Sequence, residues 1–258
     1  MKSLPVLGTV LLAASLHPVL AANVPVRFAE GVTHGFLVLR SLDGAILAHG
    51  DLLQAARGDE IAKQMIFRFK DGSTFDERTS FTQNGIYALK TYTLSERGPA
   101  FDADTELSLT AATGAYRVTV KDHKGGKEKT LEGVLELPPD VYNGLIMTIV
   151  KDLPKGTGET VHLVAFTPEP RIIQLAMSPL DEQKVTVGDL TKNAVRIVMK
   201  PKLGMWLKFF ATILGRIPPD VHAWILTDDV PAFVGYEGTL GTQDSIWRIE
   251  VVSPRRSE

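Results

Sequence analysis

The chain has 258 residues, of which 44% are hydrophobic and 22% are charged, and its formal net charge is −2. Length and composition indicate a globular protein of one or two domains, and a charge so near zero gives no electrostatic basis for binding nucleic acid. There is no cysteine, which excludes disulfides, thiolate nucleophiles, cysteine-ligated zinc and the lipid anchor of bacterial lipoproteins. No segment reaches about 18 uninterrupted apolar residues, so we expect no membrane-spanning helix.

The first residues have the pattern of a secretory signal peptide. Lys2 is the only charge before Arg27, and a mostly apolar stretch runs from Leu4 to Leu16. Val19 and Ala21 then supply small side chains at positions −3 and −1 of a cleavage site. We therefore expect a bacterial protein that is periplasmic or secreted after the signal is removed.

The segment from residue 33 to residue 54 predicts a β-hairpin. Two apolar-rich runs flank Asp43-Gly44, and Asp-Gly is typical of a type I′ turn, in which both central residues have a positive φ. Such a turn places Val38 opposite His49 and Arg40 opposite Leu47. The residues expected on the core face are Leu37, Leu39, Ile46, Ala48 and Leu52.

The same alternation of short apolar-rich runs and turn residues continues along the chain. Further strands are predicted at residues 60–70, 73–81, 86–94, 105–110, 116–121, a run ending near 137, 160–166, 171–177, 184–187, 194–199, 223–226, 233–240 and 245–252. Spacings of roughly 8–12 residues favour an antiparallel meander over βαβ units. We expect residues 1–21 as signal and 22–258 as a single mainly β domain. Its fold would be a curled antiparallel sheet, a half-barrel or open barrel, with two short helices covering the concave side.

The first predicted helix follows Pro138-Pro139-Asp140. Apolar side chains recur at helical spacing on one side of residues 142–153, which predicts an amphipathic helix of about 13 residues. Pro154 and Gly156 would end it. We expect its apolar face to pack against the sheet.

The second predicted helix, residues 203–215, contains one charge, and its apolar side chains surround almost the whole circumference. A helix of this kind is either buried or bound to something apolar, and 13 residues are too few to span a bilayer. Three interpretations stay open: a helix that fills the concave side of the sheet, a lid over an apolar pocket, or a segment that touches lipid. The residues expected to contact the core or a ligand are Met205, Trp206, Phe209, Phe210 and Ile213.

Recognisable catalytic motifs are missing. The histidines form no metal-binding pair, and the nucleophile-elbow, phosphate-loop and dinucleotide-binding patterns do not occur, so we expect no metal and no cofactor. His49 and Asp51 are the one base–carboxylate pair expected on the same face of a strand. No nucleophile is implied nearby, so the pair does not define a catalytic site.

A group of acids also lies close together in the sequence. Asp71, Asp76 and Glu77 are near Arg68 and Arg78, and two carboxylates could in principle flank a substrate. The neighbouring arginines favour a different interpretation, a ladder of ion pairs on a solvated face.

A curled antiparallel sheet of about a dozen strands, covered by two short apolar helices, resembles the periplasmic lipoprotein-carrier architecture of the LolA and LolB type. It is also similar in layout to uncharacterised secreted bacterial proteins of that half-barrel group. The resemblance implies a concavity that holds acyl chains and a soluble rather than membrane-anchored branch. It assigns no functional residue of this chain.

The sequence therefore supports a non-enzymatic binding or carrier protein for a lipid-like apolar ligand of the cell envelope. One alternative is a secreted hydrolase or isomerase with an unrecognised acid–base site. Another is a structural or assembly protein of the envelope. Expected partners are a lipid or other apolar ligand, and a membrane surface or envelope protein, but not nucleic acid.

The signal peptide leads to a direct prediction about processing. The exported protein should begin at Ala22 or Asn23, because both cleavage frames end on an alanine. Intact-mass measurement of protein recovered from the periplasm or medium decides between them. A mature chain that keeps Met1 to Leu20 would contradict the prediction.

Overall fold

The computed structural model describes residues 23–154, 156–166, 169–202, 220–228, 230–241 and 245–253. Nearly all of its regular structure is one 14-stranded antiparallel sheet. The strands are β1 (Thr33–Arg40), β2 (Ile46–Arg57), β3 (Glu60–Phe69), β4 (Thr74–Thr82), β5 (Ala88–Arg97), β6 (Ala103–Thr110), β7 (Ala115–Asp122), β8 (Glu128–Val134), β9 (Glu159–Ala165), β10 (Arg171–Val187), β11 (Leu190–Lys202), β12 (Val221–Leu226), β13 (Phe233–Thr239) and β14 (Ile246–Val252).

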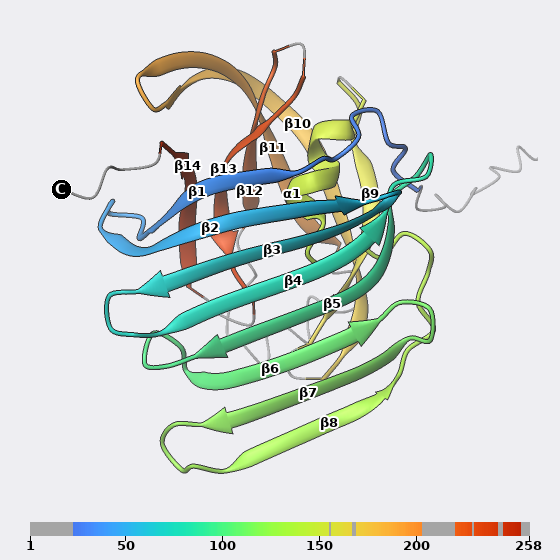
Figure 1. Cartoon of the computed structure of the whole chain (residues 1–258), viewed down its shortest axis with the longest axis vertical. Coiled ribbons are helices and arrows are strands. Elements are labelled where there is room, and N and C mark those ends of the chain that lie inside the picture. The colour runs from blue at the N-terminus through green and yellow to red at the C-terminus, as the bar shows by residue number, and fades with distance from the viewer. Residues whose placement is uncertain are drawn as a thin grey trace, which may run out of the picture.

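The strand order is β8-β7-β6-β5-β4-β3-β2-β1-β14-β13-β12-β11-β10-β9. Neighbouring strands in the sheet are therefore also neighbours in the sequence, except where β1 meets β14. The sheet curls so that β9–β14 lie behind β1–β5, and the short helix α1 (Ile146–Ile149) lies between these two walls (Figure 1). In the described strands no pairing joins β8 to β9. The fold is therefore mainly β and barrel-like, but the barrel is not closed.

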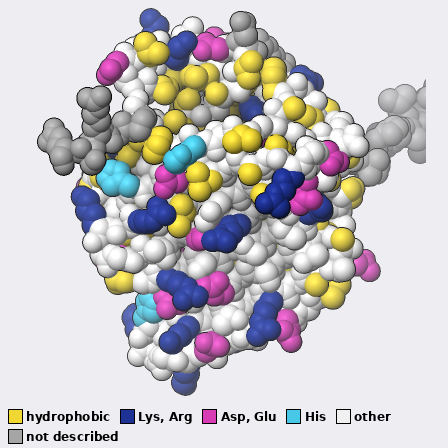
Figure 2. All heavy atoms as spheres, in the orientation of Figure 1, with side chains coloured by type: hydrophobic (Ala, Val, Ile, Leu, Met, Phe, Trp, Pro, Cys, Tyr) yellow, Lys and Arg dark blue, Asp and Glu magenta, His cyan; other side chains and the backbone are white. Residues whose placement is uncertain are grey.

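Period-two alternation separates an apolar inner face from a polar outer face. In β3, Ile61, Met65 and Phe67 are buried, whereas Arg68, the residue after Phe67, points outward and is exposed. The outer face of β4–β6 carries ion pairs such as Arg97 with Glu106, at 2.7 Å. Figure 2 shows basic and acidic side chains interspersed over this face. This is the pattern expected where one face of a sheet is packed and the other is solvated.

The turn between β1 and β2 differs from the prediction. The Gly44 amide donates to the Ser41 carbonyl, and the Ser41 amide donates to the carbonyl of Ala45, both at 3.0 Å. Gly44 has a φ of 91°, but no described residue other than glycine has a positive φ, so Asp43 does not adopt the type I′ conformation. The loop therefore has three residues, with the glycine alone in the left-handed region. Gly72 (φ 88°) forms the equivalent turn between β3 and β4.

This longer turn changes the register only near the turn itself. Val38 pairs with His49 as predicted, but a bulge next to Arg40 pairs it with Ile46 rather than Leu47. The faces of the strands beyond the bulge are unaffected, because the extra residue of the loop is offset by the bulge.

Strand β10 joins two segments that the sequence predicted as separate strands, at residues 171–177 and 184–187. Pro179 lies between them, beside a bulge that runs to Glu182. Pairing with β9 ends at Met177, so the proline is in the part of β10 where one edge carries no neighbouring strand among those described. Proline is tolerated at such edges and bulges, and here it marks a bend instead of an end.

The helix predicted over residues 142–153 is much shorter. Only Ile146–Ile149 is α-helical, and a 3-10 turn, η1 (Val150–Asp152), follows it. Gly144 has a φ of 70°, which interrupts a right-handed helix, and the residues before it are extended along the edge of β9. The apolar spacing thus reflects burial within the barrel rather than one continuous helix.

Two sequence-based predictions lie outside the described residues: the signal peptide at 1–21, and the helix at 203–215 with Met205, Trp206, Phe209, Phe210 and Ile213. Strand β11 ends before this segment and β12 begins after it. Within the described part of the chain, the structure contains no helix long and apolar enough to cross a membrane.

The β1–β2 turn provides a test of the framework. Replacing Gly44 with valine should lower the free energy of unfolding by on the order of 1–2 kcal/mol, because a β-branched residue is strained at this positive φ. Gly31→Val is the matched control, since Gly31 has an ordinary φ and, as at Gly44, a Cβ there would have no atom within 4 Å. Equal denaturant midpoints for the two variants would contradict the turn assignment.

Candidate functional site

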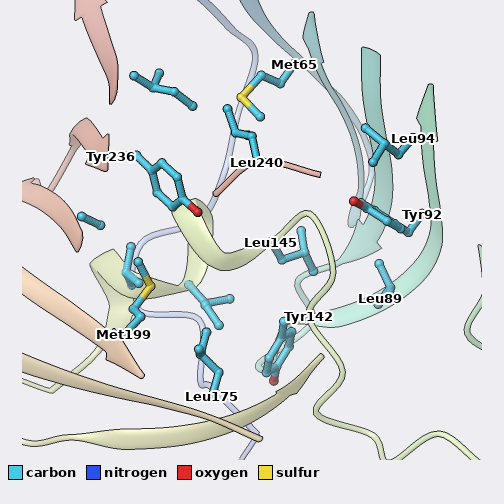
Figure 3. Packing of buried hydrophobic residues seen from close by; sticks show 14 of the residues in the cluster. Met65, Leu89, Tyr92, Leu94, Tyr142, Leu145, Leu175, Met199, Tyr236 and Leu240 are labelled. Carbon is cyan, nitrogen blue, oxygen red and sulfur yellow. The ribbon is translucent and has the colours of Figure 1, made fainter. Parts of the chain in front are cut away.

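The space between the two walls is the natural place for a ligand in a curled sheet, and the chain fills much of it. Figure 3 shows Tyr92 and Leu94 of β5 on one side and Met199 and Tyr236 on the other, with Leu145 between them. We call residues Asp140–Asp152, which enter this space, the plug. The plug links the walls through polar side chains as well as through apolar packing.

One end of the plug is fixed to the edge strand β9. The Asn143 side chain donates to the Val164 carbonyl and accepts from the Val164 amide, at 2.9 and 2.8 Å. The Tyr142 amide donates to the His162 carbonyl, and the His162 amide donates to the Asp140 carbonyl. The plug therefore satisfies backbone groups at an edge that would otherwise lack partners.

The imidazole of His162 also contacts the Asp140 carboxylate, at 2.8 Å from Nδ1. A buried carboxylate that orients a histidine is half of a catalytic arrangement. The other ring nitrogen of this histidine lies 3.4 Å from the Gln174 amide nitrogen, which is not a nucleophile. The Asp140–His162 pair is therefore structural: it joins the plug to β9.

Asp152 fixes the other end of the plug. Its carboxylate is fully buried and accepts from the amides of Arg27 and Phe28, at 2.6 and 2.8 Å, and from the Tyr87 hydroxyl at 2.8 Å. Burial and the neighbouring carboxylate raise the pKa of Tyr87 above its ordinary value, so its hydroxyl remains a donor. Asp152 thus holds the segment before β1 to the plug and to Tyr87. The Val24 amide, which donates to the Tyr142 hydroxyl, and the ion pair of Glu30 with Lys151 hold the same segment to the plug.

A lysine reaches the middle of the plug from β3. Lys63, only 6% exposed, donates to the Gly144 carbonyl at 3.0 Å and lies 3.4 Å from the Thr148 hydroxyl. Burial lowers its pKa, although the charges of Glu77 and Glu30 oppose the shift. The Lys63 ammonium group therefore links strand β3 to the plug.

Glu77 of β4 lies on the same inner face. Its carboxylate accepts a hydrogen bond from the Tyr92 hydroxyl at 3.1 Å. Burial raises the pKa of Glu77, and Lys63 and the Tyr92 hydrogen bond partly offset the effect. The interior therefore contains a small polar cluster within otherwise apolar walls.

The inner face is less completely filled at the β8 end of the sheet. Tyr116, Val118 and Val120 of β7 and Leu131 of β8 alternate with polar residues that face outward. Val118 is buried, but the other three remain half-exposed. The ring of Tyr116 lies over Gly133, where a Cβ would come within 2.8 Å of its hydroxyl. This leaves an apolar shelf, which we define as Tyr116, Val120 and Leu131.

The predicted pairing of His49 with Asp51 is not formed. Asp51 instead contacts Nε2 of His34 at 2.9 Å and Nη1 of Arg68 at 3.0 Å, and these contacts, the His34 hydrogen bond first, lower its pKa. His49 is exposed. The partners of Asp51 lie on the two neighbouring strands, β1 and β3, and closeness in the sequence did not indicate them.

The predicted ladder of ion pairs across strands is not formed by Asp76 and Glu77, although Asp76 does lie on the solvated face with an arginine as its partner. Asp76 faces outward and forms an ion pair with Arg78 at 2.8 Å, whereas Glu77, one residue further, faces inward. Strand alternation was the available signal, because Phe75, Thr79 and Phe81 share the face of Glu77. The same reasoning applied to Ile61 and Met65 would have placed Lys63 inside.

The described residues include no cluster of three or more histidine, aspartate or glutamate side chains that could hold a metal ion. The polar groups of the interior are instead engaged with the plug and with one another.

Comparisons with known proteins give two findings besides the absence of any matching family model. Over 90 residues, or 34% of this chain, the sequence is 29% identical to the 3-deoxy-manno-octulosonate cytidylyltransferase of Rhizobium etli. The match spans 31% of that relative's length.

The second finding is a likeness in fold to a solved structure, a beta-barrel-like protein of Domain of Unknown Function DUF1849 from Brucella abortus. It has a TM-score of 0.47 and 10% identity, and covers 86% of this chain and 96% of that one. Both proteins are barrel-like.

The raised pKa of Glu77, whose side chain is half-buried, predicts a pH dependence of stability. Because the pKa of Glu77 is raised from 4.5, the folded protein keeps a proton that the unfolded chain releases. Stability should therefore fall as pH rises from about 4.5 through the raised pKa, and Glu77→Gln should remove this decline. Urea unfolding across this range measures it, with Glu106→Gln on the outer face as control. If the free energy of unfolding of wild type and of Glu77→Gln changes with pH in parallel, the raised pKa of Glu77 is contradicted.

Proposed function

We propose that this chain is a non-enzymatic binding or carrier protein that holds a lipid-like apolar ligand against the inner face of its sheet. The observation that carries the proposal is the apolar shelf of Tyr116, Val120 and Leu131, which faces inward yet remains half-exposed. Inward-facing apolar side chains are ordinarily covered, and each one left in water costs the free energy that its burial would provide. An apolar ligand would supply the missing cover.

The contrast between the two faces of the same strands supports this proposal. On β7 and β8 most outward residues are polar, with Thr119 and Thr130 joined by a hydrogen bond at 3.0 Å and Arg117 beside Glu132 at 3.5 Å, although Val134 also faces outward. An edge that is merely solvated would have no reason to keep an apolar inner face. The alternation therefore favours a surface meant to meet an apolar partner.

The place of action that we propose is the bacterial cell envelope. The signal-like pattern at residues 1–21, the lack of cysteine and the curled antiparallel layout support it, and the layout resembles the periplasmic lipoprotein carriers. Within this proposal, Met205, Trp206, Phe209, Phe210 and Ile213 stay predicted contacts with the ligand or the core.

A pair of adjacent substitutions on β8 tests the proposal. Leu131→Glu places a charge on the shelf, whereas Thr130→Glu places the same charge on the outer face of the same strand. Native mass spectrometry of protein purified from a bacterial periplasm should show added lipid mass for wild type and Thr130→Glu. The Leu131→Glu variant should lose it, because a carboxylate in contact with an acyl chain lacks solvation.

Binding of a fluorescent fatty acid gives the quantitative readout. We expect the affinity to fall about tenfold or more, that is by ~1.4 kcal/mol or more, in Leu131→Glu alone. Equal affinity in the two variants, or no bound lipid and no binding by wild type, would contradict the proposal.

A further inference from the structure

The two edges of the sheet differ in how the rest of the chain meets them. At β9 the plug lies along the edge, and the Asn143 side chain bonds to both backbone groups of Val164. At β8, no pairing besides that with β7 occurs among the described strands, and β8 forms the lower border of the sheet in Figure 1. An edge of this kind presents a row of backbone groups with which another strand can pair.

The hydrogen bonds at the two ends of the β7–β8 ladder show which backbone groups of β8 point away from β7. The Leu135 amide donates to the Gly114 carbonyl, and the Asp122 amide donates to the Lys127 carbonyl, both at 3.0 Å. Both pairs continue the register of the ladder, in which hydrogen-bonded pairs alternate with pairs that are not bonded. The odd-numbered residues of β8 therefore bond to β7. The amides and carbonyls of the free edge belong to residues 128, 130, 132 and 134.

We propose that this free edge pairs with β8 of a second copy of the chain, antiparallel and centred on Leu131. This register pairs all seven residues of Glu128–Val134, and it places even-numbered residues opposite even-numbered ones, as hydrogen bonding across the edge requires. Each copy then uses the same surface, so the contact closes with two copies. The two sheets become one, with their inner faces on the same side.

Charge excludes the neighbouring registers. Centring on Lys129 would place that lysine opposite its own copy, and centring on Glu132 would do the same with a carboxylate. Centring on Thr130 would place Glu128 opposite Glu132. Like charges that are directly opposite destabilise a sheet, and the register centred on Leu131 has none.

The outer-face pair of this register already has a counterpart within the sheet. Thr130 lies opposite the partner's Glu132, a hydroxyl beside a carboxylate. Ser95 of β5 and Glu106 of β6 are opposite in register on the same face, and their side chains form a hydrogen bond of 2.6 Å. The strand's own sequence therefore supplies a partner of a kind that this sheet uses.

The inner-face pairs are also complementary. Lys129 lies opposite the partner's Gly133, whose side-chain position is covered by Tyr116: a Cβ there would lie 2.8 Å from the Tyr116 hydroxyl. The lysine therefore meets an aromatic ring, which attracts a cation. Leu131 meets the partner's Leu131, so the two apolar shelves become continuous.

The absence of cysteine makes this register measurable, because a single introduced thiol can bond only to its own copy. Leu131 and its counterpart form a pair without hydrogen bonds, whose Cα atoms are about 4.5 Å apart and within the range of a disulfide. Leu131→Cys should form a linked dimer on mild oxidation. Val134→Cys, at a site 70% exposed, should not, because Val134 lies about 20 Å from its own copy in this register. Intact-mass measurement without reductant reads the result, and no dimer of Leu131→Cys, or equal linkage of both variants, would overturn the register.

Two substitutions at Thr130 test the pairing without altering the inner face. Thr130→Lys places an ammonium group opposite the partner's Glu132 and should strengthen self-association threefold to tenfold, whereas Thr130→Glu should weaken it by as much. Ser108→Lys and Ser108→Glu make the same changes of net charge on the outer face of β6 and should leave self-association unchanged. Sedimentation velocity over protein concentrations up to ~1 mM measures it, since a Kd of that size is visible there. A wild type that stays monomeric, or Thr130 variants that behave like their Ser108 counterparts, would overturn the proposal.

Self-association and lipid binding can be told apart with the same proteins. Thr130→Glu should weaken the dimer and still retain lipid, because the shelf is unchanged. Retained lipid in a wild type that stays monomeric would overturn the dimer alone. A wild-type dimer without bound lipid and without fatty-acid binding would support the pairing and overturn the proposed function.

Discussion

The curled shape of the sheet depends on the plug, because it is the segment whose polar bonds connect widely separated strands. Asn143 binds the edge strand β9, Lys63 reaches the plug from β3, and Asp152 holds the segment that precedes β1. These bonds form where water is largely excluded, so breaking any of them leaves a buried group without a partner. The cost of leaving a buried polar group unpaired therefore holds the plug in one position and fixes the distance between the two walls of the sheet.

The fold class could be predicted from the sequence because it rests on local signals. The glycines at 44 and 72 mark turns, and period-two alternation marks strands. The helix over residues 142–153 could not be predicted correctly, since Tyr142, Leu145 and Ile149 are buried for different reasons: one along an edge strand, the others inside the barrel. Spacing alone does not distinguish a helix from an irregular segment surrounded by apolar walls.

The polar interior was predictable in part. Alternation along β3 and β4 places Lys63 and Glu77 inward, and a charged residue among inward apolar neighbours is itself a signal. The partners were not predictable, because Gly144 lies 81 residues from Lys63. The second face of β1 was hidden for the same reason: Phe36 and Val38 lie on the side opposite Leu37 and Leu39, but which strand lies beside them is decided by long-range pairing with β14.

The pairing of β1 with β14 has a consequence for how the chain reaches its native state. Arg40 and Glu250, which form an ion pair across these strands, are 210 residues apart. The meander from β1 to β8 forms from near neighbours, but one edge of β1 stays open until almost the whole chain has been made. Loop closure over such a distance is slow, and an open apolar-flanked strand attracts wrong partners meanwhile. The strand that completes the sheet beside β1 is therefore the last of the described strands to be made.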